Sequence, residues 1–263
     1  MRVELASEPI APDRDNLDWA GATPTVAVVL DGLTEGPATG CRHGTAWYVG
    51  QLGARLLAYA GTGQDLADCL AAAITDVGRL HEDTCDLAHP GTPCTTVTMI
   101  RRRGRHTDYL VLADSPLVLD LGGTPTVFID ESEKAVSAPI GRPPNATPEE
   151  LKAFIQRQQS FRNVDGGYWV AQLDPAAGYH ALRGTVDDAQ GAILASDGAA
   201  LLVTDFGLWS WEQFLQTGYA DGPQAIIDET RRAEAGDPDR VRWQRAKVSD
   251  DATVIVCRWR PGL

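Results

Sequence analysis

The sequence lacks the features that mark membrane, secreted and nucleic-acid-binding proteins. No apolar run approaches the ~20 residues that a membrane helix requires, and the N-terminal segment MRVELASEPIAPDRD contains no apolar core of a signal peptide. Positive charge is scarce as well, since the formal net charge is −13, whereas nucleic-acid-binding proteins present a basic surface. We therefore expect a cytoplasmic protein that binds no membrane and no nucleic acid.

Cysteine is also sparse. Five cysteines occur, none of them in a C-x-x-C pair, and this pattern favours reduced thiols over a disulfide framework. One part of the sequence does gather cysteine and histidine: Cys41, His43, His81, Cys85, His89 and Cys94. Zinc prefers such ligands, but their spacing matches no common zinc motif. We interpret them as scattered helix and loop residues and expect no structural zinc.

The chain does contain enough apolar material for one packed domain, which we place over residues 1–263, because 43% of its residues are hydrophobic. The apolar run 26–30 predicts a buried strand. Further patterns predict helices over 44–60, 64–80, 147–161, 209–217 and 223–235, a loop over 137–147, and strands over 95–101, 109–112, 117–119, 126–129, 167–170, 179–186, 192–195 and 252–259. Strands and helices come in groups, which favours an α+β layered domain.

Aspartates stand where several apolar strands end or begin. Asp31 follows the strand 26–30, Asp197 follows 192–195, Asp250 and Asp251 precede 252–259, and Asp114 is a weaker case after 109–112. Carboxylates gathered at one sheet edge would repel one another and raise their pKa values, and a hard divalent cation would remove that repulsion. Glycine follows Asp31 and Asp197, so a backbone carbonyl could approach as well. Asp-Gly is also a common tight turn, however.

Six short motifs follow one another along the chain: Asn16-Leu17-Asp18, Val28-Val29-Leu30-Asp31-Gly32, Thr92-Pro93-Cys94-Thr95-Thr96, Ala113-Asp114-Ser115, Ser196-Asp197-Gly198 and Asp250-Asp251-Ala252-Thr253-Val254-Ile255. In these motifs the sequence resembles the type-2C metal-dependent protein phosphatases. Gly166-Gly167-Tyr168-Trp169 and the segment Arg231–Glu234 are similar to a bacterial branch of that family. Each motif alone is weak, but together they cover nearly the whole chain in the family's order.

The resemblance implies a four-layer αββα sandwich, in which two central, mostly antiparallel sheets are flanked by helices. It implies a monomeric phosphoric monoester hydrolase that acts on phosphoserine or phosphothreonine in proteins, or on a small phosphorylated metabolite. The cofactors would be two Mn²⁺ or Mg²⁺ ions, with a weakly held third. A hydroxide bridging the two ions would then attack the phosphate.

The resemblance also implies the site residues. The metal ligands would be Asp18, Asp31, Gly32, Asp114, Asp197 and Asp250. Asp31 would bridge both ions and Gly32 would offer its carbonyl, whereas Asp114 would serve only the third ion. Together with Arg14, the residues Asp31, Asp197 and Asp250 would form the catalytic centre.

The sequence departs from the family pattern at three places. Asp13 occupies the position of the phosphate-binding arginine, so that Arg14, Arg42 or Arg162, or the metals alone, would have to hold phosphate. The segment 33–36 reads Leu-Thr-Glu-Gly in place of a glycine pair, and Leu201 stands where an aspartate often serves the third metal. A pseudophosphatase, with the same fold kept as a binding or regulatory module, therefore stays open as an alternative.

Other catalytic schemes find less support. No G-x-S-x-G motif and no P-loop is present. A haloacid-dehalogenase-like phosphatase needs Asp-x-Asp after its first strand, and Leu33 occupies the second of those positions. The general acid is not identified by the sequence. His43 is the nearest candidate along the chain, but it is also a plausible helix-start histidine.

Overall fold

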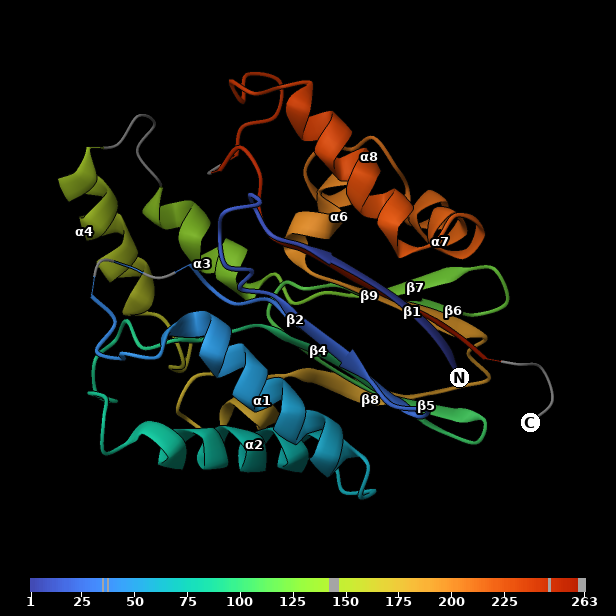
Figure 1. The fold of residues 1–263 in the computed structure, drawn as a ribbon, viewed down its shortest axis with the longest axis horizontal. Coiled ribbons are helices and arrows are strands. Elements are labelled where there is room, and N and C mark those ends of the chain that lie inside the picture. Colours follow the sequence, from blue (N-terminus) through green and yellow to red (C-terminus); the bar gives the residue numbers. More distant parts are fainter. Residues whose placement is uncertain (35, 37, 142–146, 246, 260–263) are drawn as a thin grey trace.

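Two five-stranded antiparallel sheets lie face to face and carry helices on their outer faces (Figure 1). The computed structural model describes residues 1–34, 36, 38–141, 147–245 and 247–259. The first sheet has the order β1 (Arg2–Glu8), β10 (Ala252–Arg258), β9 (Gly191–Ala195), β6 (Leu117–Asp120), β7 (Pro125–Phe128). The second has the order β2 (Trp19–Ala22), β3 (Val26–Leu30), β4 (Val97–Arg103), β5 (His106–Leu112), β8 (Leu182–Asp187). This arrangement confirms the expected αββα sandwich of the α+β class.

Helices cover each sheet from outside. The second sheet is covered by α1 (Gly44–Ala60), α2 (Leu66–His81) and the short α5 (Ala177–His180), and the first by α6 (Asp197–Thr204), α7 (Trp211–Ala220) and α8 (Pro223–Ala235). The remaining helices, α3 (Ser132–Ile140) and α4 (Pro148–Gln159), lie at the end of the sandwich away from the chain termini (Figure 1). Among the described residues, no helix has the length and apolar character needed to cross a membrane.

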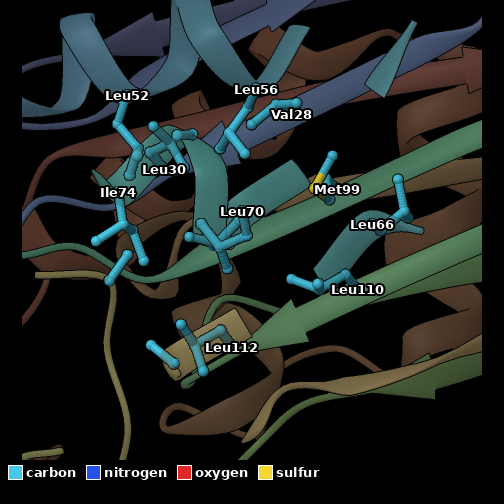
Figure 2. Close-up of a cluster of buried hydrophobic side chains, with 14 of the residues drawn as sticks. Val28, Leu30, Leu52, Leu56, Leu66, Leu70, Ile74, Met99, Leu110 and Leu112 are labelled. Atoms are coloured by element: carbon cyan, nitrogen blue, oxygen red, sulfur yellow. The ribbon is translucent and has the colours of Figure 1, made fainter. Parts of the chain in front are cut away.

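Strand β3 shows how the layers are held. All five of its residues are buried. Val28 and Leu30 pack against α1 and α2, where Figure 2 shows them beside leucines of both helices, whereas Ala27 and Val29 face the core between the sheets. Burying a Val or Leu side chain is worth about 1.5–3 kcal/mol. A strand covered on both faces therefore holds the residue that follows it, Asp31, in a fixed position.

Patterns of the sequence located the buried elements best. β3, α1 and α8 have the bounds that their patterns predict, and the other predicted strands over 95–129 and 192–259 lie within three residues of the observed ones. The edge strands β1 and β2 were missed. Strand β1 lies at the edge of its sheet and pairs only with β10. An edge strand can carry charged residues, and in β1 these are Arg2, Glu4 and Glu8, which interrupt the apolar pattern.

Three predictions around the irregular middle of the chain are wrong. The predicted loop 137–147 begins inside α3, which contains Pro139 in its last turn and ends at Gly141 with φ of 66°; residues 142–146 lie outside the described residues. The predicted strand 179–186 divides into α5 and β8, because α5 packs closely on α2. The predicted strand 167–170 forms only an isolated bridge, at Tyr168, within the described chain.

Candidate metal centre

The carboxylates that the sequence singles out do meet at one end of the sandwich. Asp31 leaves β3 of one sheet, while Asp197 and Asp250 adjoin β9 and β10 of the other. Together with Asp114, which follows β5, these three line a cavity of about 160 Å³. Asp18, just before β2, is close enough for its charge to act on Asp31. Both sheets thus contribute acids to the same place.

Asp31 is tied to the start of α6. The backbone N–H of Asp197 donates to Oδ2 of Asp31 at 3.2 Å. Ser196 precedes Asp197 as the N-cap residue of α6, and its Oγ accepts from the N–H of Thr253 at 2.9 Å. The Asp31 carboxylate therefore lies at the positive end of a helix dipole, beside the strand that follows Asp250.

Asp197-Gly198 is not the tight turn that its sequence allows, because Asp197 is the first residue of α6. The sequence missed this helix, in which Asp-Gly stands at the start rather than in a turn. Gly198 is needed for packing: a Cβ there would lie 2.1 Å from the carbonyl oxygen of Asp251. The glycine lets α6 approach the segment that carries Asp250, which brings two of the acids together.

Gly32 is equally constrained. Its N–H donates to the carbonyl of Leu17 at 3.2 Å, and a Cβ at this position would lie 2.4 Å from that oxygen and 2.6 Å from Cγ2 of Thr45. Glycine thus allows the segment before Asp18, strand β3 and helix α1 to meet. A role of the Gly32 carbonyl as a metal ligand stays a prediction.

Removal from bulk water and mutual repulsion raise the pKa values of these acids. Burial first, and then the charges of Asp197 and Asp251, raise the pKa of Asp18 to about 7. Burial, with Asp197 and Glu133 nearby, raises the pKa of Asp114 to about 7 as well. The pKa of Asp31 is raised well above its ordinary value by burial and by Asp197 and Asp18, and the pKa of Asp197 is also raised, chiefly by burial.

A divalent cation fits this donor set. Oδ2 of Asp18 is buried and has no hydrogen-bond partner in the described part of the chain, which is costly unless a ligand satisfies it. The surrounding donors are hard carboxylate oxygens, the type that Mg²⁺ and Mn²⁺ prefer. Bound cations would satisfy the orphan oxygen and cancel the repulsion between the acids.

Lys247 stands beside the acids, and the sequence analysis missed it. Its Nζ lies 2.7 Å and 2.8 Å from the two carboxylate oxygens of Asp250 and donates to Oγ1 of Thr34 at 2.8 Å. Although burial works against its charge, Asp250, Asp197 and Asp31 raise the pKa of Lys247. Its position three residues before the Asp250-Asp251 pair, in a chain with only three lysines, was the available signal.

The two adjacent aspartates have different surroundings. Asp250 faces the cavity and Lys247, whereas Asp251 accepts hydrogen bonds from the N–H groups of Ile10 and Leu17, at 2.6 Å and 3.0 Å. Asp251 thereby fastens the N-terminal segment beneath the site. Arg231 holds the same segment from α8, through the carbonyl of Pro9.

Of the arginine candidates, Arg14 lines a cavity together with one of the acids. This cavity has a volume of about 520 Å³ and is also lined by Lys247 and Asp250. Arg162 instead donates to the hydroxyl of Tyr168 and to the carbonyl of Pro90, both at 3.4 Å, and Arg42 is exposed and lines none of the described cavities.

His43 is not brought to the carboxylates. Its ring stacks on Trp47 with 4.4 Å between the centroids, and its Nε2 lies 3.2 Å from Oγ1 of Thr84. None of the cavities described around the acids is lined by His43. His43 is the N-cap residue of α1, so its interpretation as a helix-start histidine is confirmed and its candidacy as the general acid is not supported.

The surroundings of Asp114 differ from the rest. A second cavity, of about 360 Å³, is lined by Asp114, Asp197, Leu201 and Glu133. Leu201 presents an apolar side chain where the family pattern has a carboxylate. Glu133, from α3, lies on the same wall, but its Oε1 already accepts hydrogen bonds from Ser137 and Gln158.

Comparison with known proteins bears on the fold. Neither a protein-family model nor a curated protein sequence matches the chain. Among solved structures, the catalytic domain of the serine/threonine phosphatase PstP in complex with two manganese ions is similar, with 19% identity, a TM-score of 0.62, and coverage of 98% of this chain and 97% of that one. PstP of Mycobacterium tuberculosis gives 20% identity, a TM-score of 0.63, and coverage of 98% of both chains.

A third similar structure is the PPM Ser-Thr phosphatase MsPP of Mycobacterium smegmatis in complex with cacodylate. It has 19% identity, a TM-score of 0.56, and coverage of 99% of both chains. At such identities the likeness establishes the fold. The chain therefore has the fold of the bacterial PPM serine/threonine phosphatases over nearly its whole length.

Proposed function

We propose that this chain is a metal-dependent phosphatase that hydrolyses phosphoserine or phosphothreonine, or a related phosphomonoester. The observation that carries the proposal is the convergence of Asp18, Asp31, Asp197 and Asp250 at one end of the sandwich, with an unsatisfied buried oxygen on Asp18. The PstP structure that shares the fold contains two manganese ions, which supports Mn²⁺ or Mg²⁺ as the cofactor here.

The residues that would hold two ions are Asp18, Asp31, Asp197 and Asp250, with the carbonyl of Gly32. When bound, such ions activate water and neutralise the charge of phosphate oxygens. Asp31 is central, because the carboxylates of Asp18, Asp197 and Asp250 all act on it. Asp114 would serve a third and weaker ion. That residues 1–263 form a single monomeric, cytoplasmic domain stays part of this proposal.

Lys247 and Arg14 are the cations that we assign to the phosphate group. They line the same cavity as Asp250, and position 13, where the family pattern has arginine, is an aspartate. A lysine ammonium donates up to three hydrogen bonds and serves well as a point charge for phosphate. Arg14 is exposed and can offer a planar guanidinium from the rim of the cavity.

The ion pair of Lys247 with Asp250 also favours a second candidate function. An ammonium that contacts both oxygens of Asp250 already neutralises one proposed metal ligand. If it stays there in the presence of metal, the chain is a pseudophosphatase that binds phosphorylated partners without turnover.

The test is a phosphatase assay on the purified chain, with a chromogenic phosphate ester and with phosphoserine and phosphothreonine peptides. The expected result is hydrolysis that requires Mn²⁺ or Mg²⁺ and stops in chelator. Full activity in chelator would contradict the metal mechanism. Binding of the phosphopeptides without hydrolysis at any Mn²⁺ concentration would establish the pseudophosphatase instead.

A further inference from the structure

A second group of potential metal ligands lies away from the carboxylates. Cys41, His81 and Cys85 each offer one ligand atom, and these three atoms lie within 4.8 Å of one another. The interpretation of these residues as scattered is therefore wrong for these three. None of them lines a cavity described around the acids.

Local structure explains why residues so far apart in sequence meet. His81 is the last residue of α2. The N–H of Cys85 donates to the carbonyl of His81 at 2.9 Å, so the chain makes one further turn after the helix ends. The N–H of Asp86 then donates to the carbonyl of Gly40 at 2.8 Å. This contact places Cys41 against the end of α2, so the cluster joins the entry to α1 with the exit from α2.

The distances are those of ligands around one small cation. Sγ of Cys41 lies 3.5 Å from Nδ1 of His81 and 3.2 Å from Sγ of Cys85. Tetrahedral zinc has Zn–S distances of about 2.3 Å and Zn–N distances of about 2.0–2.1 Å. This geometry places a sulfur and a nitrogen ligand about 3.6 Å apart and two sulfur ligands about 3.8 Å apart. A disulfide requires the two sulfurs at about 2.05 Å. The distance between the two sulfurs of Cys41 and Cys85 is therefore nearer to the spacing of two metal ligands than to a disulfide bond.

The environment of His81 also suits a ligand. Its side chain is 1% exposed and lies against the rings of Trp47 and His43. Nε2 has no hydrogen-bond partner in the described part of the chain, while Nδ1 faces Cys41. Within the described part of the chain, Cys41 thus provides the polar contact of this imidazole. Burial lowers the pKa of His81, which favours the neutral form of the ring that binds metals.

We propose that Cys41, His81 and Cys85 hold one thiophilic divalent cation of the zinc class, at a site separate from the carboxylates. Three protein ligands leave one tetrahedral position for water or an exogenous ligand. The two sulfurs are partly exposed, so an ion can enter from solvent.

Such an ion would clamp the start of α1. Four residues after Cys41, Thr45 donates to the carbonyl of Leu33 at 3.3 Å and packs on Gly32. Gly32 directly follows Asp31, the central residue of the carboxylate cluster. The role that we assign to the site is therefore structural: it fixes α1 and α2 relative to one another beneath the strand that carries Asp31.

The test uses the full chain stripped of metal and titrated with Co²⁺, which reports thiolate ligands by a charge-transfer band, and with Zn²⁺. We expect one equivalent of Co²⁺ to produce the band and Zn²⁺ to displace it. The double variant Cys41→Ser with Cys85→Ser should lose the band and at least 100-fold in affinity. Cys69→Ser, a buried thiol at the other end of α2, is the matched control and should keep both.

Independence from the carboxylates is tested in the same titration, because Asp31→Asn should bind Co²⁺ with an unchanged thiolate band. Thiol counting on the unmodified chain covers the case of a misfolded double variant: Zn²⁺ should protect two thiols from a thiol reagent. A missing band, or a band that survives in the folded double variant, would overturn the proposal. So would two thiols already lost to a disulfide that only a reductant restores.

Discussion

The carboxylate cluster and the thiol cluster are separate groups of potential ligands, and they differ in what holds them without metal. The acids repel one another, and their pKa values are raised. The thiols and the imidazole of His81 instead contact one another directly, within hydrogen-bond distance. The first cluster therefore destabilises the fold until a cation arrives, whereas the second tolerates the absence of its ion.

This contrast suggests different uses. Sites that store unfavourable electrostatics are typical of catalysis, because the same arrangement stabilises charge that develops during reaction. A cluster of mutually contacting groups that joins two helices adds stability when metal binds. Without metal it does not lower the stability of the fold.

The largest expected effect is the loss of turnover in Asp31→Asn. The charges of Asp18, Asp197 and Asp250 all act on Asp31, so removing its charge should lower kcat at saturating Mn²⁺ by at least ~100-fold, the size seen when built-in charge stabilisation is lost. The melting temperature of the metal-free variant should rise, because one repelling carboxylate is gone. Kinetics with a chromogenic phosphate ester and thermal melts in chelator measure both effects.

Two controls accompany Asp31→Asn. Asp239→Asn changes an exposed aspartate that lines none of the described cavities, and it should match the parent chain. The double variant of Cys41 and Cys85 should keep turnover within a small factor at saturating Mn²⁺. An active Asp31→Asn, or an equal loss in the thiol variant, would remove the distinction between the clusters.

Lys247→Gln is expected to have the second largest effect. If Lys247 binds the phosphate group, kcat/KM should fall by roughly 10- to 100-fold, the usual cost of a lost hydrogen bond to a charged group, mainly through KM. Lys134→Gln is the control, since Lys134 lines the cavity of about 360 Å³ and pairs with Glu131 at 3.8 Å. An unchanged KM with a lower Mn²⁺ requirement would mean that Lys247 competes with metal for Asp250.

The stability of the metal-free chain should depend on pH in a way that the thiol cluster cannot produce. Asp18 and Asp114 have pKa values of about 7 in the fold, against about 3.9 when unfolded. The folded state therefore binds more protons between these values. The contribution of these two groups to the free energy of unfolding should be greatest below about pH 4 and should be lost as the pH rises through 7.

Thermal melts in chelator at pH 5 and pH 8 measure this effect, with a drop of several degrees expected at the higher pH. Saturating Mn²⁺ should abolish or reverse the drop, because the ions favour the ionised acids. Asp18→Asn and Asp114→Asn should each flatten the profile. A metal-free chain that is more stable at pH 8 than at pH 5 would mean that other groups outweigh these acids.

The sequence predicted what depends on short-range pattern. Asp31 was found because it directly follows the fully apolar strand β3, and Asp250 because it lies two residues before the mainly apolar strand β10. The αββα architecture followed from the resemblance and from the grouping of strands and helices. The helix start at Asp197 was hidden, because Asp-Gly permits both a turn and a helix start.

What the sequence could not predict depends on contacts between distant segments. Lys247 acquires its role from Asp250 and Thr34, the latter more than 200 residues away. Cys41 meets His81 and Cys85 only because the two helices pack and Asp86 bonds to Gly40. His43, chosen by its place along the chain, turns to Trp47 instead. The spacing of residues along the sequence does not predict such contacts between distant segments.

The smallest expected effect belongs to Asp114→Asn. In the cavity that Asp114 lines, Leu201 offers no carboxylate at the place where the family pattern has one, and Glu133 nearby is already hydrogen-bonded. An ion there would be held weakly, with the core of Asp18, Asp31 and Asp197 left intact. We expect kcat to fall by less than about tenfold, equivalent to about 1.4 kcal/mol, and the Mn²⁺ concentration for half-maximal activity to rise.

The companion variant Leu201→Asp sharpens this prediction, because it returns a carboxylate to the wall beside Asp114 and Asp197. It should lower the Mn²⁺ requirement, and Asp114→Asn placed on the same background should cancel that gain. Metal-titrated kinetics on the two single variants and the double variant give the coupling directly. Near-complete loss of turnover in Asp114→Asn would place Asp114 in the same rank as Asp31, and a Leu201→Asp variant without any change in Mn²⁺ dependence would show that no ion is held at this wall.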